Sequence, residues 1–274
     1  MFATAKELVD ACKAGRVYGN YPNEKVAQEF IDKELQRALD NNQGCKDNRP
    51  WHIVDFAQKL DKKLPWIGFE FETGFNSKDE YQQFIRWLWD QPYVAIDREG
   101  TGEYPVEVAF PPQTLKDMED NDHLLMRCVK WVEDNKLTPA RNPTTFTKRD
   151  VGIHAGISTA KWRAMDDARN DRYNACNKLD RLLDSLNDEQ RNAAYGRTAL
   201  HWGCAHNRHS YVELKMFRAI PSSEYIAQVV VVTKQCVKML DALLDDFNVL
   251  DKWDNTDVFN FLTNPDADIE LEKK

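Results

Sequence analysis

The sequence predicts an α+β fold, with a mostly antiparallel sheet of about five or six strands and helices packed on one side. Two observations predict it. Short segments alternate apolar with other residues, as half-buried strands do, and longer segments between them carry apolar residues at helical spacing. The length of 274 residues allows one large domain or two small ones, with room for a substantial core, and the lack of a linker favours one domain. We expect an N-terminal helical region over 1–62, a main domain over 63–250, and an acidic tail over 251–274 that frays.

The first predicted strand, 66–72, sets the pattern for the others. Its apolar residues Ile67, Phe69 and Phe71 share one face, while Glu70 and Glu72 share the opposite face. The other strands share this short alternating pattern and are predicted at 93–96, 104–110, 151–158, 195–202 and 211–218. The helices share apolar residues at three- and four-residue spacing and are predicted at 26–39, 55–62, 79–91, 115–135, 162–190 and 222–247. Residues 138–149 and the His-rich 203–210 are predicted loops, and the first has about the length of loops that usually carry function or mobility.

Composition and charge exclude several classes of function. With 37 Lys and Arg against 45 Asp and Glu, the net charge of -8 argues against binding to a nucleic-acid backbone. No segment has the roughly 18 consecutive apolar residues of a membrane span, and the N-terminus lacks the apolar block of a signal peptide. The six cysteines form no C-x-x-C pair, which is typical of free thiols in a reducing compartment. We therefore expect a cytoplasmic protein with no nucleic-acid or membrane partner.

Carboxylates within predicted strands are the candidate functional residues. Glu70 and Glu72 stand two residues apart and project from one face about 7 Å from each other. Glu107 and Glu213 fall within later strands, although glutamate is disfavoured in strands. Carboxylate oxygens are the ligands that Mg²⁺ prefers, so these residues suggest a metal site; the alternative is that they line the solvent faces of amphipathic strands.

Five short motifs follow one another along the chain: G-x-E-x-E at 68–72, V-E-V-A-F-P-P at 106–112 after Asp97, G-I-H-A-G-I at 152–157, Arg197 within a predicted strand, and V-E-L-K-M-F at 212–217. Their order and spacing resemble those of the amidoligase family of the glutamine-synthetase-like carboxylate–amine ligases. The resemblance spans about residues 66–240, with a long helix after the last motif as in that family.

The resemblance implies a glutamine-synthetase-like catalytic domain that uses ATP and Mg²⁺ to form an amide or isopeptide-like bond through an acyl phosphate. A small-molecule or peptide carboxylate and an amine would be the substrates. The implied metal ligands are Glu70, Glu72, Glu107 and Glu213. The implied residues that bind the nucleotide phosphates and act in catalysis are His154, Arg197 and Lys215.

Three departures from the family pattern raise a second hypothesis. Gly156 replaces the second histidine of the H-x-H motif, Lys215 replaces an arginine, and Glu99 replaces a serine. Lysine keeps the positive charge but loses the bidentate geometry of the guanidinium group. The alternative function is therefore a catalytically degenerate ligase-like fold that acts as a binding or inhibitory protein.

The segment 201–209 offers another chemistry. It contains His201, Cys204, His206 and His209, and histidine and cysteine at close spacing suit tetrahedral Zn²⁺. The pattern matches no standard zinc finger and lacks a second nearby cysteine, so we interpret it as a polar loop beside the active cleft. P-loop and G-x-G-x-x-G motifs are absent from the sequence, which directs attention to the strand carboxylates for nucleotide binding.

Overall fold

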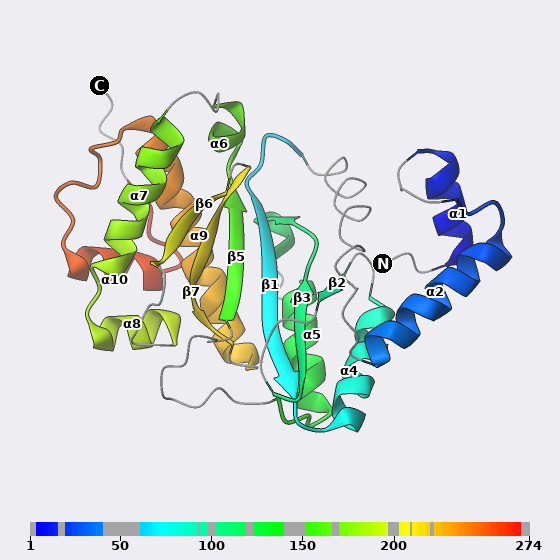
Figure 1. Ribbon diagram of the computed structural model, residues 1–274. Helices are drawn as coiled ribbons and strands as arrows, with labels where there is room; N and C mark the ends of the chain where they lie inside the picture. The colour runs from blue at the N-terminus through cyan, green and yellow to red at the C-terminus, as the bar shows by residue number, and fades with distance from the viewer. Residues whose placement is uncertain are drawn as a thin grey trace. The chain divides into compact units, whose positions relative to one another are not determined.

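The structure is a computed structural model, and it describes residues 4–15, 20–40, 61–91, 94–97, 102–118, 123–139, 152–165, 170–196, 203–208, 210–219 and 222–269. The chain divides into two compact units. The first contains residues 1–60, 70–112 and 131–151, and the second contains 61–69, 113–130 and 152–274. Both units combine helices with antiparallel strand pairs, so the predicted α+β class is confirmed (Figure 1).

The first unit contains a three-stranded ladder in the order β2-β3-β1, and both of its strand pairs are antiparallel. Its strands are β2 (Ala95–Asp97), β3 (Tyr104–Ala109) and the second half of β1 (Trp66–Phe75). Its helices are α1 (Ala5–Lys13), α2 (Glu24–Leu39) and α4 (Lys78–Trp89). The predicted helices at 26–39 and 79–91 and the strands at 93–96 and 104–110 are confirmed within a few residues.

Helix packing in the first unit follows from local sequence signals. The hydroxyl of Thr4 caps α1 by accepting a hydrogen bond from the amide of Glu7, whose side chain accepts one from the amide of Thr4 in return. The apolar side of α1 packs on α2 in a buried cluster that includes Leu8 and Ala27. The hydroxyl of Tyr81 on α4 donates a 2.5 Å hydrogen bond to the carbonyl of Ala38, at the end of α2.

The second unit contains a ladder in the order β1-β5-β7-β6, with β4 paired to the start of β1. Its strands besides β1 are β4 (Gln113–Thr114), β5 (Gly152–Ser158), β6 (Ala205–Arg208) and β7 (Tyr211–Arg218). Its helices are η2 (Lys116–Met118), α6 (Ala160–Ala164), α7 (Asp171–Asp184), α8 (Asp188–Tyr195), α9 (Ser223–Asp245) and α10 (Asn255–Thr263). Helix α5 (Leu124–Asp134) begins in this unit and ends in the first.

One face of β5 and β7 is buried against helices. Ile153, Ala155 and Ile157 alternate along β5 and are all fully buried. Helix α9 lies behind these strands in Figure 1 and is the longest of the described helices, with 23 residues. This packing leaves the opposite face of β5 and β7 for the polar residues of the strands.

A bulge in β7 sets which of its side chains reach the core. Ile153 pairs with Phe217 but Ala155 pairs with Leu214, so β7 has one more residue than β5 in this interval. Lys215 and Met216 therefore lie opposite His154. Because side chains alternate between the faces of a strand, the extra residue returns Phe217 to the buried face.

Two predictions about strands are wrong. The strand expected at 195–202 does not begin at Tyr195, which ends α8, because Gly196 adopts a left-handed conformation with φ 71° that terminates the helix. The His-rich segment expected as a loop contains β6, which forms a hairpin with β7. Four polar or small residues have little strand propensity of their own, so pairing with β7 decides the structure of β6.

Several helix predictions also change. The helix expected over 115–135 is shorter, since β4 and η2 come before α5, and the helical region 162–190 is divided into α6, α7 and the start of α8. The expected fraying tail contains α10, whose Val258 and Leu262 are fully buried. Residues 55–60, expected as part of a helix, and 140–149, expected as part of a loop, lie outside the described residues.

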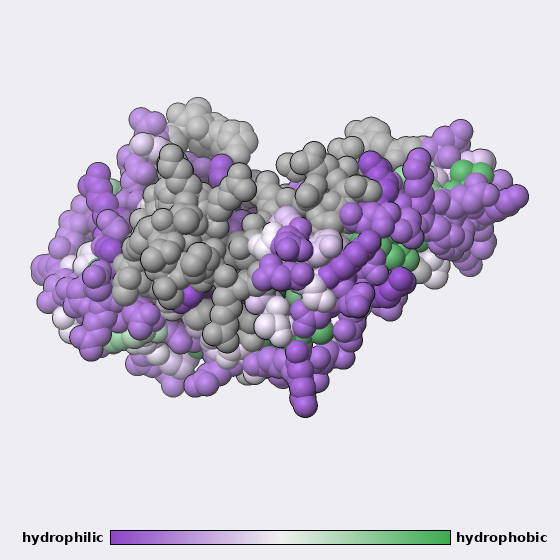
Figure 2. Space-filling model, turned by 60° about the horizontal axis from the view of Figure 1, so that its bottom comes forward, coloured by the Kyte–Doolittle hydropathy of each residue, from purple (hydrophilic) through white to green (hydrophobic). Residues whose placement is uncertain are grey.

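The surface of the described residues is mostly polar. Figure 2 shows one face on which hydrophilic residues predominate and hydrophobic residues occur in small groups. The large hydrophobic side chains that are most exposed among the described residues are Leu64, Tyr173 and Phe247. None of the helices in the described segments is both long and apolar enough for a bilayer span.

Candidate functional site

Three carboxylates line up across the ladder of the first unit. Glu72 on β1 pairs with Glu107 on β3, and Glu107 pairs with Asp97 on β2. Directly paired residues of antiparallel strands project from the same face, with Cβ atoms about 4.5–5.5 Å apart. We call these three residues the acidic row. Two of the four expected metal ligands, Glu72 and Glu107, are thus directly paired, and Asp97, expected at the start of a turn, is the last residue of β2.

The acidic row is largely withdrawn from solvent. Glu107 is 3% exposed and Asp97 is 7% exposed, while Glu72 is half-buried. A buried ionised carboxylate is costly unless a cation or a hydrogen-bond donor accompanies it. Glu70 lies two residues before Glu72 on the same face of β1 and pairs with Ala109. A rigid, oxygen-rich face of this kind matches the ligand preference of Mg²⁺.

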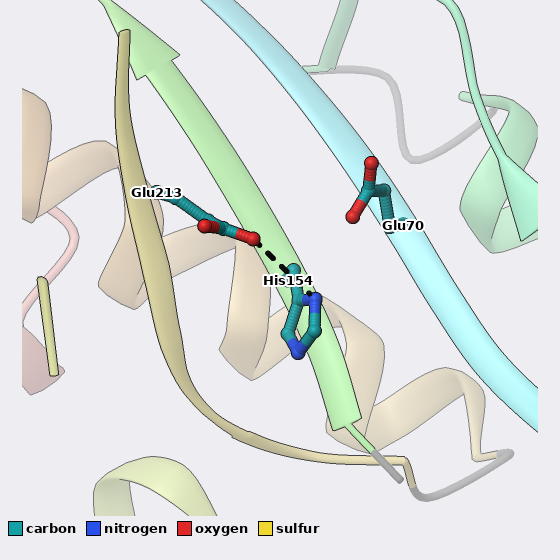
Figure 3. Close-up of side chains that lie close together, drawn as sticks. All are labelled: Glu70, His154 and Glu213. Carbon is teal, nitrogen blue, oxygen red and sulfur yellow. Dashed lines mark ion pairs between the residues drawn. The ribbon is translucent and has the colours of Figure 1, made fainter. Parts of the chain in front are cut away.

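A second cluster of charged side chains surrounds Glu213 in the second unit. Glu213 is buried on β7, and its two carboxylate oxygens have different partners. The Nε atom of Arg208 donates to Oε2 at 2.6 Å, and the Nζ atom of Lys215 lies 3.3 Å from Oε1. The Nδ1 atom of His154 lies 3.7 Å from the same Oε1 (Figure 3). We call these four residues the Glu213 cluster.

Strand pairing explains how these residues meet. Lys215 follows Glu213 by two positions and therefore shares its face. Glu213 pairs with Gly156 on β5 and with His206 on β6, so His154 projects from the same face, two residues before Gly156. The cluster therefore gathers residues from the β6–β7 hairpin and from β5, which lies about 50 residues earlier in the sequence.

The space beside Gly156 is taken by an aromatic ring. A Cβ atom added to Gly156 would lie 3.1 Å from Cδ2 and 3.3 Å from Cε2 of Tyr211, closer than ordinary van der Waals contact. In the family pattern this position carries the second histidine. In this chain the ring of Tyr211 occupies the position beside Glu213 where that side chain would begin.

The turn that leads into β6 is fixed by Asp180 of α7. Its Oδ1 atom accepts hydrogen bonds from the amides of Cys204 at 2.6 Å and Ala205 at 2.9 Å. Gly203 precedes them with φ 83°, and a Cβ atom there would lie 2.9 Å from the same Oδ1. This turn sets where β6 begins and hence where Arg208 lies along β7.

Within each unit, the structure brings some of the predicted site residues together. His154, Lys215 and Glu213 come together in the second unit, and Glu72 and Glu107 come together in the first. Glu70 lies on β1 and is also labelled in Figure 3. The residues that lie outside the described part of the chain are Arg197, Glu99, His201 and His209.

Arg208 is the member of the Glu213 cluster that sequence reasoning missed. The sequence predicts a loop at Arg208, because residues 205–208 show no alternation of apolar and polar side chains. The connection between β6 and β7 is two residues long, but its sequence His-Ser is not one of the pairs typical of a hairpin turn, so the sequence offers no signal for β6.

Cys204, a candidate zinc ligand in the sequence, is fully buried. Burial, with a smaller contribution from Asp180, raises the pKa of its thiol well above the ordinary value. Because the thiolate is the form that binds metal or attacks a substrate, this environment disfavours both roles. His206 lies on β6 facing Glu213, in a different setting from the predicted loop.

Comparison with known proteins adds no assignment. A scan against known protein families finds no match. A search of curated proteins finds no relative. The functional argument therefore depends on the sequence motifs and on the geometry of the acidic row and the Glu213 cluster.

Proposed function

We propose that the protein is an ATP- and Mg²⁺-dependent carboxylate–amine ligase that forms an amide or isopeptide-like bond through an acyl phosphate. The observation that carries the proposal is the acidic row, in which Glu72 and Glu107, from two separate motifs, face each other on paired strands. A buried Asp97 extends the row on a third strand. The order of the sequence motifs supports the same reaction class.

The acidic row is a suitable place for Mg²⁺. Glu72, Glu107 and Asp97 offer only carboxylate oxygens, which this hard cation prefers, and the strands hold them rigidly. Glu70, on the same face of β1, is a further candidate ligand. Bound Mg²⁺ supplies neutralisation of the charge on the nucleotide phosphates. Glu213, the fourth expected ligand, fits this role less well, because both of its oxygens have cationic neighbours.

His154 and Lys215 are proposed to act on the negative charge of the reacting groups. Both lie beside Glu213, which holds their positions, and both can donate hydrogen bonds to phosphate or carboxylate oxygens. Arg197 is assigned the same task by the family resemblance. In the proposed reaction, the substrate carboxylate attacks the γ-phosphorus of ATP and ADP leaves. The amine then attacks the acyl carbon, phosphate leaves, and the amine loses a proton.

The direct test is ADP release from ATP with Mg²⁺ and pools of candidate carboxylates and amines. Products that have lost one water are sought by mass spectrometry. Glu72→Gln and Glu107→Gln keep the side-chain shape but remove a charge, and we expect each to lower turnover roughly 100-fold or more. The control is Glu189→Gln, at an exposed position of α8. Full turnover in both site variants would refute the metal assignment.

A specific observation favours a second candidate function, a degenerate ligase-like protein that binds or inhibits. The ring of Tyr211 lies against Gly156, where the family has a histidine, and Arg208 contacts Glu213. Calorimetry with Mg-ATP separates the two functions. Absence of binding at millimolar nucleotide, together with no ADP release in the presence of substrates, would favour the second.

A further inference from the structure

The buried carboxylate of Glu213 is paired with two basic side chains. We propose that Arg208, together with Lys215, supplies at Glu213 the positive charge that a divalent cation would otherwise supply. Glu213 then holds the two basic side chains and does not bind the metal. The inference refines the metal site of the proposed ligase, and so rests on that function. Its test measures metal binding alone.

Both carboxylate oxygens of Glu213 lie close to a basic side chain. Arg208 Nε donates to Oε2 at 2.6 Å, which is a short, charge-assisted hydrogen bond. Lys215 Nζ lies 3.3 Å from the other oxygen, Oε1. The side chain of Glu213 is only 8% exposed, so its charge depends on these partners more than on water.

A metal ion at Glu213 would have to compete with these groups. Mg²⁺ binds oxygen ligands at about 2.0–2.1 Å in near-octahedral geometry and tolerates little distortion. At Oε2 the ion would displace the guanidinium group of Arg208, and at Oε1 it would lie close to the ammonium group of Lys215. Like charges at such separations repel strongly where little water intervenes. His154 Nδ1 lies 3.7 Å from Oε1, and the competition comes from the two basic side chains (Figure 3).

The position of Arg208 follows from the hairpin. Arg208 pairs with Tyr211, so Glu213 is its diagonal neighbour two residues further along β7. Long side chains reach diagonal neighbours on the same face of an antiparallel pair. Position 156, on the other side of Glu213, has no side chain to contribute, so the polar partners of this carboxylate come from β6, from β7 and from His154.

The test is a titration of the full-length protein with Mn²⁺, with free and bound ion measured by electron paramagnetic resonance. The variants are Glu213→Gln, Arg208→Gln, Arg208→Lys and the double variant with glutamine at both positions. Arg181→Gln, at an exposed position of α7, is the matched control. Circular dichroism confirms that each variant is folded.

We expect Glu213→Gln to leave Mn²⁺ affinity and stoichiometry within twofold of the native protein. We expect Arg208→Gln to gain one additional ion, or to bind at least tenfold more tightly, and the double variant to lose this gain. Arg208→Lys keeps a cation and should show no gain. A tenfold loss of Mn²⁺ affinity in Glu213→Gln would overturn the proposal, even if Arg208→Gln failed to fold. A folded Arg208→Gln variant without the gain would overturn it as well.

Discussion

Glu107 and Glu213 are both buried glutamates in the middle of a strand, but they face different charges. Glu107 lies between Glu72 and Asp97 on the neighbouring strands. Glu213 contacts the basic groups of Arg208 and Lys215. The same residue type in the same kind of motif therefore has carboxylate neighbours on the paired strands in one unit and basic neighbours in the other.

Buried thiols lead to a prediction at the residue scale. Burial raises the pKa of Cys176 to about 12, and it also raises the pKa values of three other thiols, those of Cys128, Cys204 and Cys236. Ellman's reagent reacts with thiolates. We expect at most two of the six cysteines to react rapidly in the native protein, and we expect this number to be the same at pH 7 and at pH 9.

Guanidinium chloride provides the control for this prediction, because unfolding should make all six thiols reactive. Rapid reaction of three or more thiols in the native state would contradict the burial described for these side chains. Mass spectrometry of alkylated peptides identifies which cysteines have reacted.

At the scale of elements, the turn into β6 is the most constrained backbone near the Glu213 cluster. Gly203→Ala puts an L-residue at φ 83° and pushes its Cβ atom against Asp180. Left-handed backbone costs about 1–2 kcal/mol, and the displaced carboxylate loses hydrogen bonds, so we expect unfolding free energy to fall by about 2–4 kcal/mol. Urea unfolding measures the loss.

Gly15→Ala is the matched control, since Gly15 also has a left-handed φ of 68° but nothing lies within 4 Å of the added Cβ. We expect it to cost only about 1–2 kcal/mol, for the backbone alone. Equal losses in the two variants would show that contact with Asp180 contributes nothing.

The elements that could be predicted are those in which apolar residues recur with a clear strand or helix periodicity. The alternation of Ile67, Phe69 and Phe71 predicts β1, and similar alternation predicts β5 and β7 and their buried faces. The strand β6 could not be predicted in this way, because pairing with β7 forms it. For α10 a signal was present: the side chain of Asp254 caps the helix through the amide of Asp257.

The same limit applies to the candidate site. Two strand patterns predicted that Glu72 and Glu107 project from polar faces, and pairing then placed them opposite each other. The charge around Glu213 could not be predicted, because it depends on Arg208 in an element without a sequence signal and on a bulge that keeps Lys215 opposite His154.

For the whole molecule, the net charge of -8 leads to a prediction about metal. If the acidic row binds Mg²⁺, the ion stabilises the folded state, and a saturating concentration should raise the Tm by about 2–6 °C. Differential scanning calorimetry measures this shift, with NaCl of equal ionic strength as the reference.

Two variants show where the stabilising ion binds. We expect Glu107→Gln to abolish the stabilisation by Mg²⁺ and Glu213→Gln to retain it. The opposite result would place the ion at Glu213 and remove the acidic row from the metal site. Identical shifts in both variants would indicate that Mg²⁺ acts elsewhere on the acidic surface.

The short connection between β6 and β7 has a consequence for the order of events during folding. Arg208 and Glu213 are five residues apart in the chain, whereas His154 and Glu213 are 59 residues apart. Isolated hairpins form in about 1–10 μs, and contacts between distant segments form later. We therefore expect the contact between the guanidinium group and the carboxylate to form early, together with the hairpin, and the contact with His154 to form later.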